Sequence, residues 1–379
     1  MNAHSIPSIA LQSAPQMAAE SRGVKEIDFH SDPRYQRFVA SHPEAVIFHN
    51  SGWLQSLERE YGAKCLMLAT EDTDAALTGV LPLFYTKGMP LGLGGMLGGR
   101  RLSSLPRTPV GGPLSLHPAA SAALLRSAVE HARSEPGTQL EIKLARPLPA
   151  GAQAGLSEVP WRVFYVLDLP RRPEEIRFGN SNRHSQIKRG VDKAIRQGVR
   201  PVVADSEAEL AAWHDIYART MQRNGVMARS RRLFEALWDL LRPRGQMRLW
   251  LAKRDAKVVA GVLVLGSGST AFFGYGGWLE GDACAHANDL LHWEAIHEAC
   301  RMGYRSYDFG EVPDGDAGLA RFKAKWNTRA ERLVRYYDPA PAAGGSRSGT
   351  RVRRFAKDIW RRMPGAAVRQ LSDWMYGYL

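Results

Sequence analysis

The pattern of apolar and polar residues is most regular between residues 270 and 327. In this stretch we predict a strand, a glycine pair, a helix, a second strand and a short lysine-bearing helix, with almost no loop between them. Residues 271–275 are mostly aromatic and predict the first strand, which we expect Gly276 and Gly277 to end. Polar side chains at the edges of these elements are therefore expected to converge on one site.

The helix of this stretch is predicted between residues 288 and 302, where apolar side chains recur every three or four positions. Asn288 is a suitable N-cap, because its side chain can accept from a free backbone N–H, and Gly303 is a suitable helix stop. Residues 305–309 again resemble a strand, which ends in the sequence Asp-Phe-Gly. Asp308 therefore stands at a strand end and belongs to the same predicted site.

The rest of the chain predicts helices and short strands. Helices are expected at residues 51–61, 119–134, 180–197, 208–224 and 231–241, and strands at residues 45–49, 65–69, 79–86, 139–145, 162–169, 247–253 and 257–265. Residues 146–160 are rich in Pro, Ala and Gly, which is typical of a linker or a long surface loop. No crossover helix separates the strands between residues 247 and 275, so a purely parallel sheet is excluded. We predict an α+β fold.

The composition is that of an ordinary soluble protein and excludes a wholly disordered chain. Of the 379 residues, 44% are hydrophobic and 23% are charged. The three cysteines form no C-x-x-C pair and are few for a disulfide framework, which favours a reducing compartment. The longest apolar run, residues 258–265, is far shorter than the ~20 residues of a membrane-spanning helix. Residues 1–23 do not resemble a secretion signal and are expected to be a disordered tail, so we predict a cytoplasmic protein.

The formal charge of +13 is concentrated in two segments, which suggests phosphate-bearing partners such as lipid headgroups, nucleotides or tRNA. The first segment, residues 183–200, carries six Arg or Lys residues and one Asp on a predicted helix. Its basic face is either an ordinary solvated surface or a contact for phosphates. In the second case Arg183, Lys188 and Arg189 are the candidate ligands.

The second basic segment is the end of the chain. Residues 339–350 are rich in Pro, Ala and Gly and predict a linker. Residues 351–379 carry apolar side chains at helical spacing, surrounded by arginines and tryptophan. Such basic amphipathic helices either lie on an anionic membrane surface or dock on the body of the protein, and both arrangements bury the same apolar stripe. Nucleic acid is a third candidate partner.

The sequence shows no pattern for a metal site or for covalent catalysis. His292 and His297 are five positions apart, whereas a zinc-binding helix needs a spacing of four. There is neither a Gly-x-Ser-x-Gly motif nor a convincing Cys–His pair. The glycine-rich residues 88–99 lack the third glycine of a dinucleotide-binding loop, so we interpret them as a mobile loop beside the substrate.

What remains is a set of polar residues suited to direct transfer of a group between two bound substrates. Asp308, Asp289 and Glu311 are candidate bases, and Lys323 is a candidate donor to a developing oxyanion or to a phosphate. The alternative for three residues is a structural role. Asp308 would then be a hydrogen-bond acceptor at a strand end, Asn288 a helix cap, and Lys323 a surface lysine beside aromatic residues.

Several short motifs follow one another in a fixed order along residues 40–338. They are Phe48-His49 with Trp53, Leu81-Pro82-Leu83, Gly111-Gly112-Pro113, the basic helix that ends with Lys193-Ala194 and Gly198-Val199, Tyr275-Gly276-Gly277, Asn288-Asp289, Trp293-Glu294, Asp308-Phe309-Gly310, and Phe322-Lys323 with Lys325-Trp326. Each motif is weak alone, but the ordered set resembles the Fem-type branch of the GNAT acyltransferases, including members associated with bacterial exopolysaccharide clusters.

The resemblance implies two tandem GNAT-like domains, each with a mixed, largely antiparallel sheet and flanking helices, packed across a cleft. The first domain would cover residues 24–160 and be completed by about residues 320–338, and the second would cover residues 161–319. The implied reaction is transfer of an acyl or aminoacyl group to an amino group of a lipid- or nucleotide-linked polysaccharide or cell-envelope precursor. Such an enzyme would work in the cytoplasm, at the inner face of the membrane.

By the motif match, Lys323 corresponds to the functional lysine of the family. Tyr275, Asn288, Glu311 and Trp326 are expected to contact substrate. The implied donor is acyl-CoA or aminoacyl-tRNA, with no metal. The chain lacks the [Gln/Arg]-x-x-Gly-x-[Gly/Ala] loop that holds the CoA pyrophosphate, and it lacks the long helical hairpin associated with tRNA. It also has Glu311-Val312-Pro313 where members of the family near it more often carry Arg-Ser-Lys. The alternative is a non-catalytic GNAT-fold module that binds an envelope precursor or RNA.

Overall fold

The computed structural model describes residues 22–87, 100–149, 152–281, 286–341, 360–365 and 371. The tail predicted for residues 1–21, the glycine-rich loop at residues 88–99 and most of the basic segment 351–379 lie outside the described residues. Arg22 and Gly23, which were expected in the tail, belong to the first strand.

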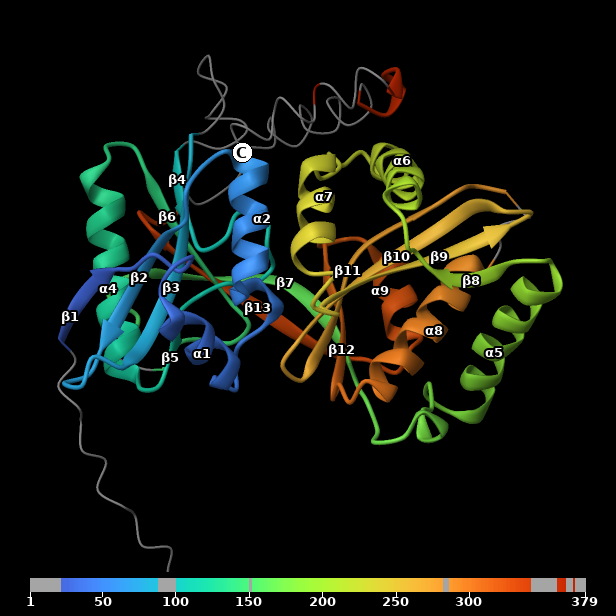
Figure 1. Cartoon of the computed structure of the whole chain (residues 1–379), viewed down its shortest axis with the longest axis horizontal. Coiled ribbons are helices and arrows are strands. Elements are labelled where there is room, and N and C mark those ends of the chain that lie inside the picture. Colours follow the sequence, from blue (N-terminus) through green and yellow to red (C-terminus); the bar gives the residue numbers. More distant parts are fainter. Residues whose placement is uncertain are drawn as a thin grey trace, which may run out of the picture.

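The described residues form a 13-stranded sheet with helices packed on it (Figure 1). The strands are β1 (Arg22–Glu26), β2 (Leu66–Glu71), β3 (Leu77–Thr86), β4 (Arg101–Ser103), β5 (Leu114–Ser115), β6 (Gln139–Leu144), β7 (Ser157–Asp168), β8 (Arg200–Val203), β9 (Met247–Arg254), β10 (Lys257–Ser267), β11 (Thr270–Trp278), β12 (Ser306–Val312) and β13 (Arg329–Asp338). The helices are α1 (Pro33–Ser41), α2 (Ser51–Tyr61), α4 (Pro118–Ser134), α5 (Ser181–Arg196), α6 (Glu207–Arg223), α7 (Arg231–Leu240), α8 (Ala287–Arg301) and α9 (Ala317–Ala324), with short 3₁₀ helices η1 (Ile47–His49) and η2 (Pro173–Glu175).

The strand order divides the sheet into two halves that share the last strand. The first half contains β1 to β6, the second contains β7 to β12, and β13 is hydrogen-bonded between β6 and β7. Each half has one parallel pair, β4 with β6 and β11 with β12, whose strands are connected through α4 and α8 respectively. The other pairs are antiparallel. This confirms the predicted α+β fold with mixed, largely antiparallel strands, and β13 makes the sheet continuous across the two halves.

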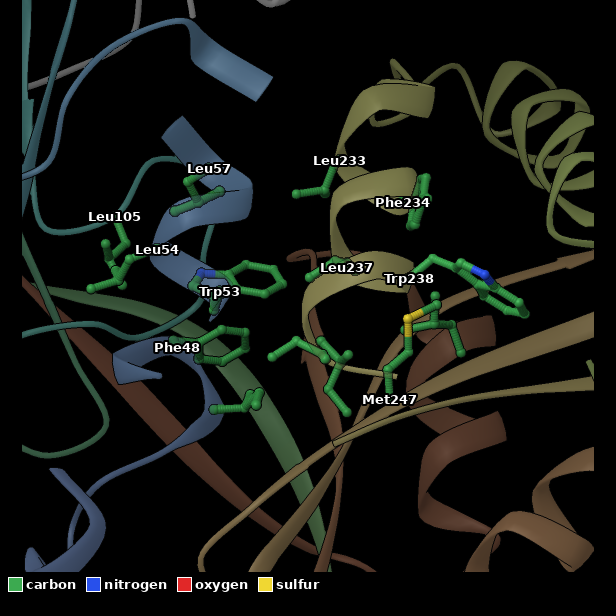
Figure 2. Close-up of a cluster of buried hydrophobic side chains, with 14 of the residues drawn as sticks. Phe48, Trp53, Leu54, Leu57, Leu105, Leu233, Phe234, Leu237, Trp238 and Met247 are labelled. Carbon is green, nitrogen blue, oxygen red and sulfur yellow. The ribbon is translucent and has the colours of Figure 1, made fainter. Parts of the chain in front are cut away.

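A shared hydrophobic core holds the two halves together. Trp53 of α2 and Leu237 of α7 point toward one another in Figure 2, and both are buried with Leu57 and Leu233 in a single cluster. Burying each such side chain contributes about 1.5–3 kcal/mol relative to leaving it exposed. The halves therefore have a fixed relative position, which a site formed by residues from both of them requires.

The helices predicted from hydrophobic periodicity between residues 51 and 302 are confirmed, but the strand predicted at residues 45–49 is wrong. Residues Ile47–His49 form the 3₁₀ helix η1 instead. The ring of His49 accepts a hydrogen bond from the backbone N–H of Val46 at 3.3 Å and donates to the carbonyl of Gly112 at 3.1 Å. The hydroxyl of Tyr35 donates to the carbonyl of His49 at 2.6 Å. These contacts hold the segment in a tight turn.

Several strands are longer than predicted, among them β11 and β7. β11 continues through Gly276 and Gly277 to Trp278, so the glycine pair does not end it. A Cβ at Gly277 would lie 2.6 Å from the Cα of Tyr217, so this glycine allows α6 to pack directly on the strand. β7 already begins at Ser157, inside the expected loop, because β13 pairs with it from residue 157 onward.

The predicted cap of the helix in the central stretch is also wrong. α8 begins at Ala287, so Asn288 lies within its first turn, and the N-cap position is taken by His286 with a φ of 66° and no side-chain cap. The predicted end is confirmed, because the helix stops at Arg301 and Gly303 adopts a φ of 86°. Only residues without a side-chain clash favour that left-handed conformation.

Part of the C-terminal segment contacts the second half. The side-chain amide of Gln222 donates to the carbonyls of Trp360 and Met363 at 3.3 and 2.7 Å, and Nε of Arg361 donates to the carbonyl of Arg223 at 3.1 Å. These bonds attach residues 360–363 to the end of α6. None of the helices in the described parts of the chain is long and apolar enough to cross a membrane.

Candidate active site

A cavity of about 650 Å³ lies between the two halves. The parallel pairing of β11 with β12 ends at Phe272 and Asp308, and the residues just beyond that point on both strands line the cavity. The first half contributes residues of β3, β4 and β6 and Arg107 from the segment after β4, and β7, β12, β13 and α9 contribute the other charged side chains. The cavity is thus built by both halves and by the strand that joins them.

Lys323 lines this cavity although only 3% of the residue is exposed. Its Nζ donates hydrogen bonds to the carbonyls of Gly310 and Glu311 at 3.0 and 2.9 Å. Burial lowers the pKa of Lys323 to about 8, and the neighbouring carboxylates of Asp308 and Glu311 oppose the decrease. Among the described residues these carbonyls take two of the three N–H groups, so one can face a ligand.

The helix that carries Lys323 is fixed at both ends. The side chain of Asp316 caps α9 by accepting from the backbone N–H of Leu319 at 2.9 Å. At the other end the hydroxyl of Thr328 donates to the carbonyl of Lys323 at 3.2 Å, and Asn327 turns the chain with a φ of 65°. Because Asp316 and Lys323 lie at opposite ends of this short helix, the two fixed ends set the position of the ammonium group.

Asp308 lies behind the cavity wall rather than on its surface. Its carboxylate accepts from the backbone N–H of Gly310 at 2.7 Å and interacts electrostatically with Lys323. The residue as a whole is half-buried, but its carboxyl group is packed among protein atoms, and this burial raises its pKa to about 6. Gly310, at a φ of 75°, lets the chain bulge there so that Lys323 reaches its carbonyl.

Glu311 lines the cavity and is held by two neighbours on β7. Nε1 of Trp161 donates to its carboxylate at 3.1 Å, and Arg162 forms an ion pair with it at 2.6 Å. The other side of the Trp161 ring is occupied, because Cζ of Arg335 lies 3.6 Å from the ring centroid. A continuous line of contacts thus runs from Arg335 through Trp161 and Glu311 to Lys323.

The first half contributes a buried carboxylate surrounded by three cations, which we name the Glu141 cluster: Glu141, Arg101, Lys143 and Arg335. Arg335 donates to the Glu141 carboxylate, and Lys143 and Arg101 lie 3.6 and 3.8 Å from it. Burial alone would raise the pKa of Glu141, but the three cations outweigh it and hold the pKa at about 2. The hydroxyls of Ser103 and Tyr337 donate to the same carboxylate.

A glycine pair and a histidine from the sequence motifs support this cluster. The backbone N–H groups of Gly111 and Gly112 both donate to the carbonyl of Lys143, at 3.1 and 2.9 Å. A Cβ at Gly112 would lie 2.2 Å from Cδ2 of Leu144 and 3.1 Å from the carbonyl oxygen of Lys143, so a larger residue would force Leu144 to move. The ring of His49 donates to the carbonyl of Gly112, and burial lowers the pKa of His49 to about 4. Neutral His49 therefore holds the loop that contains Gly111 and Gly112, and the backbone N–H groups of this loop hold the carbonyl of Lys143.

The junction of the halves near the cavity contains a buried ion pair. Glu60 of α2 and Arg229, which precedes α7, lie 2.8 Å apart with side chains at 0% and 3% exposure. The backbone N–H and hydroxyl of Ser230 also donate to Glu60. Tyr275 lines the cavity beside this pair, and burial raises its pKa while Arg229 opposes the rise. The ion pair thus joins the halves and supports one wall of the cavity.

The structure brings some of the predicted site residues together and separates others. Tyr275, Glu311 and Lys323 line the cavity, Asp308 lies directly behind it, and Trp326 is buried in the core against Phe178. Asp289 lies elsewhere: its carboxylate pairs with Lys325 at 2.5 Å and approaches His286 at 3.4 Å. Asn288 is next to it and half-buried. Arg183, Lys188 and Arg189 are exposed on α5 and do not line the cavity.

Reasoning from the sequence missed the contributions of the first half and of strands β7 and β13. The residues missed are Arg101, Glu141, Lys143, Trp161, Arg162 and Arg335. The available signal was the alternation of Glu141 and Lys143 with apolar residues in the strand at 139–145. Alternation of this kind is typical of a sheet with one solvated face, so it does not identify a site. Within the described residues, no group of three or more His, Cys, Asp or Glu side chains could hold a metal ion.

Residues 181–324 match a known family described as an acetyltransferase (GNAT) domain. The matched region runs from α5 to α9 and therefore contains Asp308, Glu311 and Lys323. No curated protein sequence matches this chain significantly.

Solved structures that are similar over most of the chain include the following two. The crystal structure of FemX covers 83% of this chain and 97% of its own chain, with a TM-score of 0.63 and 17% sequence identity. The structure of L-PGS from Bacillus licheniformis covers 89% of this chain and 99% of its own, with a TM-score of 0.55 and 10% identity. At these identities the similarity establishes a common fold that extends over both halves.

Proposed function

We propose that this chain, a Fem-like member of the GNAT acyltransferase superfamily, transfers an acyl or aminoacyl group to an amine of a lipid- or nucleotide-linked polysaccharide or cell-envelope precursor. The observation that carries the proposal is the position of Lys323. It lies in the region that matches the GNAT family and lines a cavity formed by both halves. The acceptor class rests on the Fem-type order of the sequence motifs.

In the proposed reaction the amine nitrogen attacks the carbonyl carbon of the donor. A C–N bond forms while the C–S bond of a thioester, or the C–O bond of an aminoacyl ester, breaks. The amine loses a proton and the leaving group gains one. Negative charge develops on the carbonyl oxygen, and the ammonium group of Lys323 would stabilise it. Because two backbone carbonyls already hold this ammonium group, little reorganisation is needed during the reaction.

Asp308 is the best candidate for accepting the proton, through one intervening water molecule. Burial raises its pKa to about 6, and a base is most effective when its pKa lies near the working pH. The two carboxylates that line the cavity are less suitable. Glu141 has a pKa of about 2, which makes it a weak base, and Glu311 is paired with Arg162. Asp289, paired with Lys325 away from the cavity, is not required by this mechanism.

The donor is proposed to be acyl-CoA or aminoacyl-tRNA, and the position of the site in the GNAT-matching region favours acyl-CoA. A direct test is mass spectrometry of envelope and polysaccharide precursors extracted from cells with and without the gene. An acyl or aminoacyl mass increment that disappears with the gene supports the proposal and identifies the donated group. Identical precursor masses would instead support the alternative of a non-catalytic module that binds an envelope precursor or RNA. The ion-paired state of both carboxylates that line the cavity is consistent with that alternative.

The basic residues 351–379 would place the enzyme at the inner face of the cytoplasmic membrane. The contacts of residues 360–363 with α6 bring this segment to the body of the protein. The side chain of Arg362 remains exposed to solvent, where it could contact a membrane surface. Co-sedimentation of the full chain with vesicles tests the proposal. Binding to anionic but not to zwitterionic vesicles supports it, and equal binding to both, or to neither, would contradict it.

A further inference from the structure

The cavity between the halves is strongly positive. Six cationic side chains and two carboxylates line it: Arg101, Arg107, Lys143, Arg162, Lys323 and Arg335, with Glu141 and Glu311. This is a formal excess of four positive charges. Arg162 and Glu311 form a 2.6 Å ion pair and neutralise each other, so the excess lies mostly elsewhere.

Half of the excess belongs to the Glu141 cluster, and Arg107 and Lys323 carry the rest. In the cluster a single carboxylate faces three cations, and two of them are largely removed from water, because the side chains of Lys143 and Arg335 are 3% and 11% exposed. Burying uncompensated positive charge is unfavourable unless an anion completes the arrangement. The cluster is therefore short of negative charge by about two units, which a phosphate group supplies near neutral pH.

The cluster also has hydrogen-bond donors that the protein does not use. Nε of Arg335 is buried and has no hydrogen-bond partner among the described residues. The side chain of Arg101 is 41% exposed and touches Glu141 only at 3.8 Å. The hydroxyl-bearing residue Thr86 lines the same part of the cavity. Guanidinium groups with nearby hydroxyls are the donors that suit phosphate oxygens.

We propose that the Glu141 cluster binds a phosphate or diphosphate group of one of the two substrates, through Arg101 and Arg335. Glu141 holds Arg335 in place through their hydrogen-bonded ion pair and lies 3.8 Å from Arg101. The contacts from Arg335 through Trp161 and Glu311 to Lys323 connect the two ends of the cavity. The phosphate of the substrate would lie at the Arg335 end, and its reacting group at the Lys323 end. The identity of that substrate rests on the proposed function, but the existence of the phosphate site does not.

Isothermal titration calorimetry on the full chain tests the site without turnover. The probes are coenzyme A for the donor, uridine diphosphate for a nucleotide-linked acceptor, and farnesyl diphosphate for a lipid-linked acceptor. Arg101→Ala should weaken binding of at least one probe about tenfold or more, because it removes a charge-assisted hydrogen bond. Arg100→Ala is the matched control. It removes the same charge one position earlier, from a side chain that is 60% exposed and does not line the cavity.

The pattern of binding assigns the site. A loss confined to coenzyme A identifies the donor phosphates, and a loss confined to one of the diphosphates identifies the acceptor. Arg335→Gln should weaken binding of the same probe, and its melting curve shows whether this variant is folded. If it is not folded, the result for Arg101→Ala decides alone. The proposal is overturned if no probe binds, or if Arg101→Ala binds every probe as tightly as Arg100→Ala does. A phosphate site without any acyl product would overturn the proposed function and leave this inference intact.

Discussion

Cζ of Arg335 lies 3.6 Å from the centroid of the Trp161 ring, while the ring nitrogen of the same indole donates to Glu311 at 3.1 Å. Trp161 of β7 therefore contacts a cation of the last strand and a carboxylate of β12. It is the residue that connects the Glu141 cluster with the Lys323 end of the cavity.

Replacing Trp161 with Leu should destabilise the protein, because it removes the stacking of Arg335 and the hydrogen bond to Glu311. The free energy of unfolding, measured by urea denaturation, is expected to fall by about 1–3 kcal/mol, which combines a cation–π contact and a charge-assisted hydrogen bond. Trp278→Leu is the control, since Trp278 is 37% exposed and its Arg223 contact is longer, at 5.7 Å. Equal losses in both variants would show that Trp161 is only a packing residue.

Removing Lys323 should abolish most of the activity once a substrate is identified. Lys323→Ala is expected to lower kcat about 100- to 1000-fold, the range observed when a single group that stabilises an oxyanion is removed. Arg321→Ala serves as the control, because Arg321 is an exposed cation on the same helix, and its Nε donates to the carbonyl of Ala317 within α9. Full activity of Lys323→Ala in steady-state assays would rule out the catalytic role of this lysine.

The pH dependence of kcat/KM should report Asp308 and Lys323. The rate is expected to rise through about pH 6, as Asp308 loses its proton, and to fall through about pH 8, as Lys323 loses its own. Asp308→Asn should remove the acidic limb. It should also move the alkaline limb to lower pH, because the carboxylate of Asp308 favours the charged form of Lys323. An unchanged profile in this variant would mean that the limbs belong to the substrate.

The buried ion pair between Glu60 and Arg229 should be essential for stability. Glu60→Gln keeps the shape of the side chain but leaves Arg229 without its carboxylate partner, which is expected to cost about 3–5 kcal/mol of unfolding free energy. Asp239→Asn breaks the ion pair between Asp239 and Arg59, and both of these side chains are about half exposed. It should lower the unfolding free energy by less than about 1 kcal/mol. Chemical denaturation of both variants measures the difference, and a small loss for Glu60→Gln would contradict the structural role given to this pair.

The sequence predicts what depends on local pattern. The periodicity of residues 51–61 and 288–302 is enough to locate α2 and α8, since each buries one face in the core. Glycine was harder to interpret. Gly276 and Gly277 resemble a strand end, but both are part of β11, and the missing side chain of Gly277 is needed for packing against α6. Nothing in the neighbouring residues shows that a helix approaches there.

The site was predictable only on one side. Tyr275, Glu311 and Lys323 belong to a compact stretch in which strand ends and a helix meet, and the structure brings them to one cavity. The opposite wall combines β4, β6 and β13, which are far apart in the sequence. Glu141 and Arg335 are separated by almost 200 positions, so no local pattern indicates that they form an ion pair.

The placement of β13 also determines when this protein can acquire its site during synthesis. The strand is the last element of the sheet in the sequence, yet it occupies the middle and pairs with β6 and β7 on either side. Until the ribosome has released it, the growing chain presents two unpaired strand edges facing each other, and such edges invite wrong pairing. Arg335 belongs to this strand and Lys323 precedes it by only a few residues. Closure of the sheet and completion of the reactive centre are consequently a single late event.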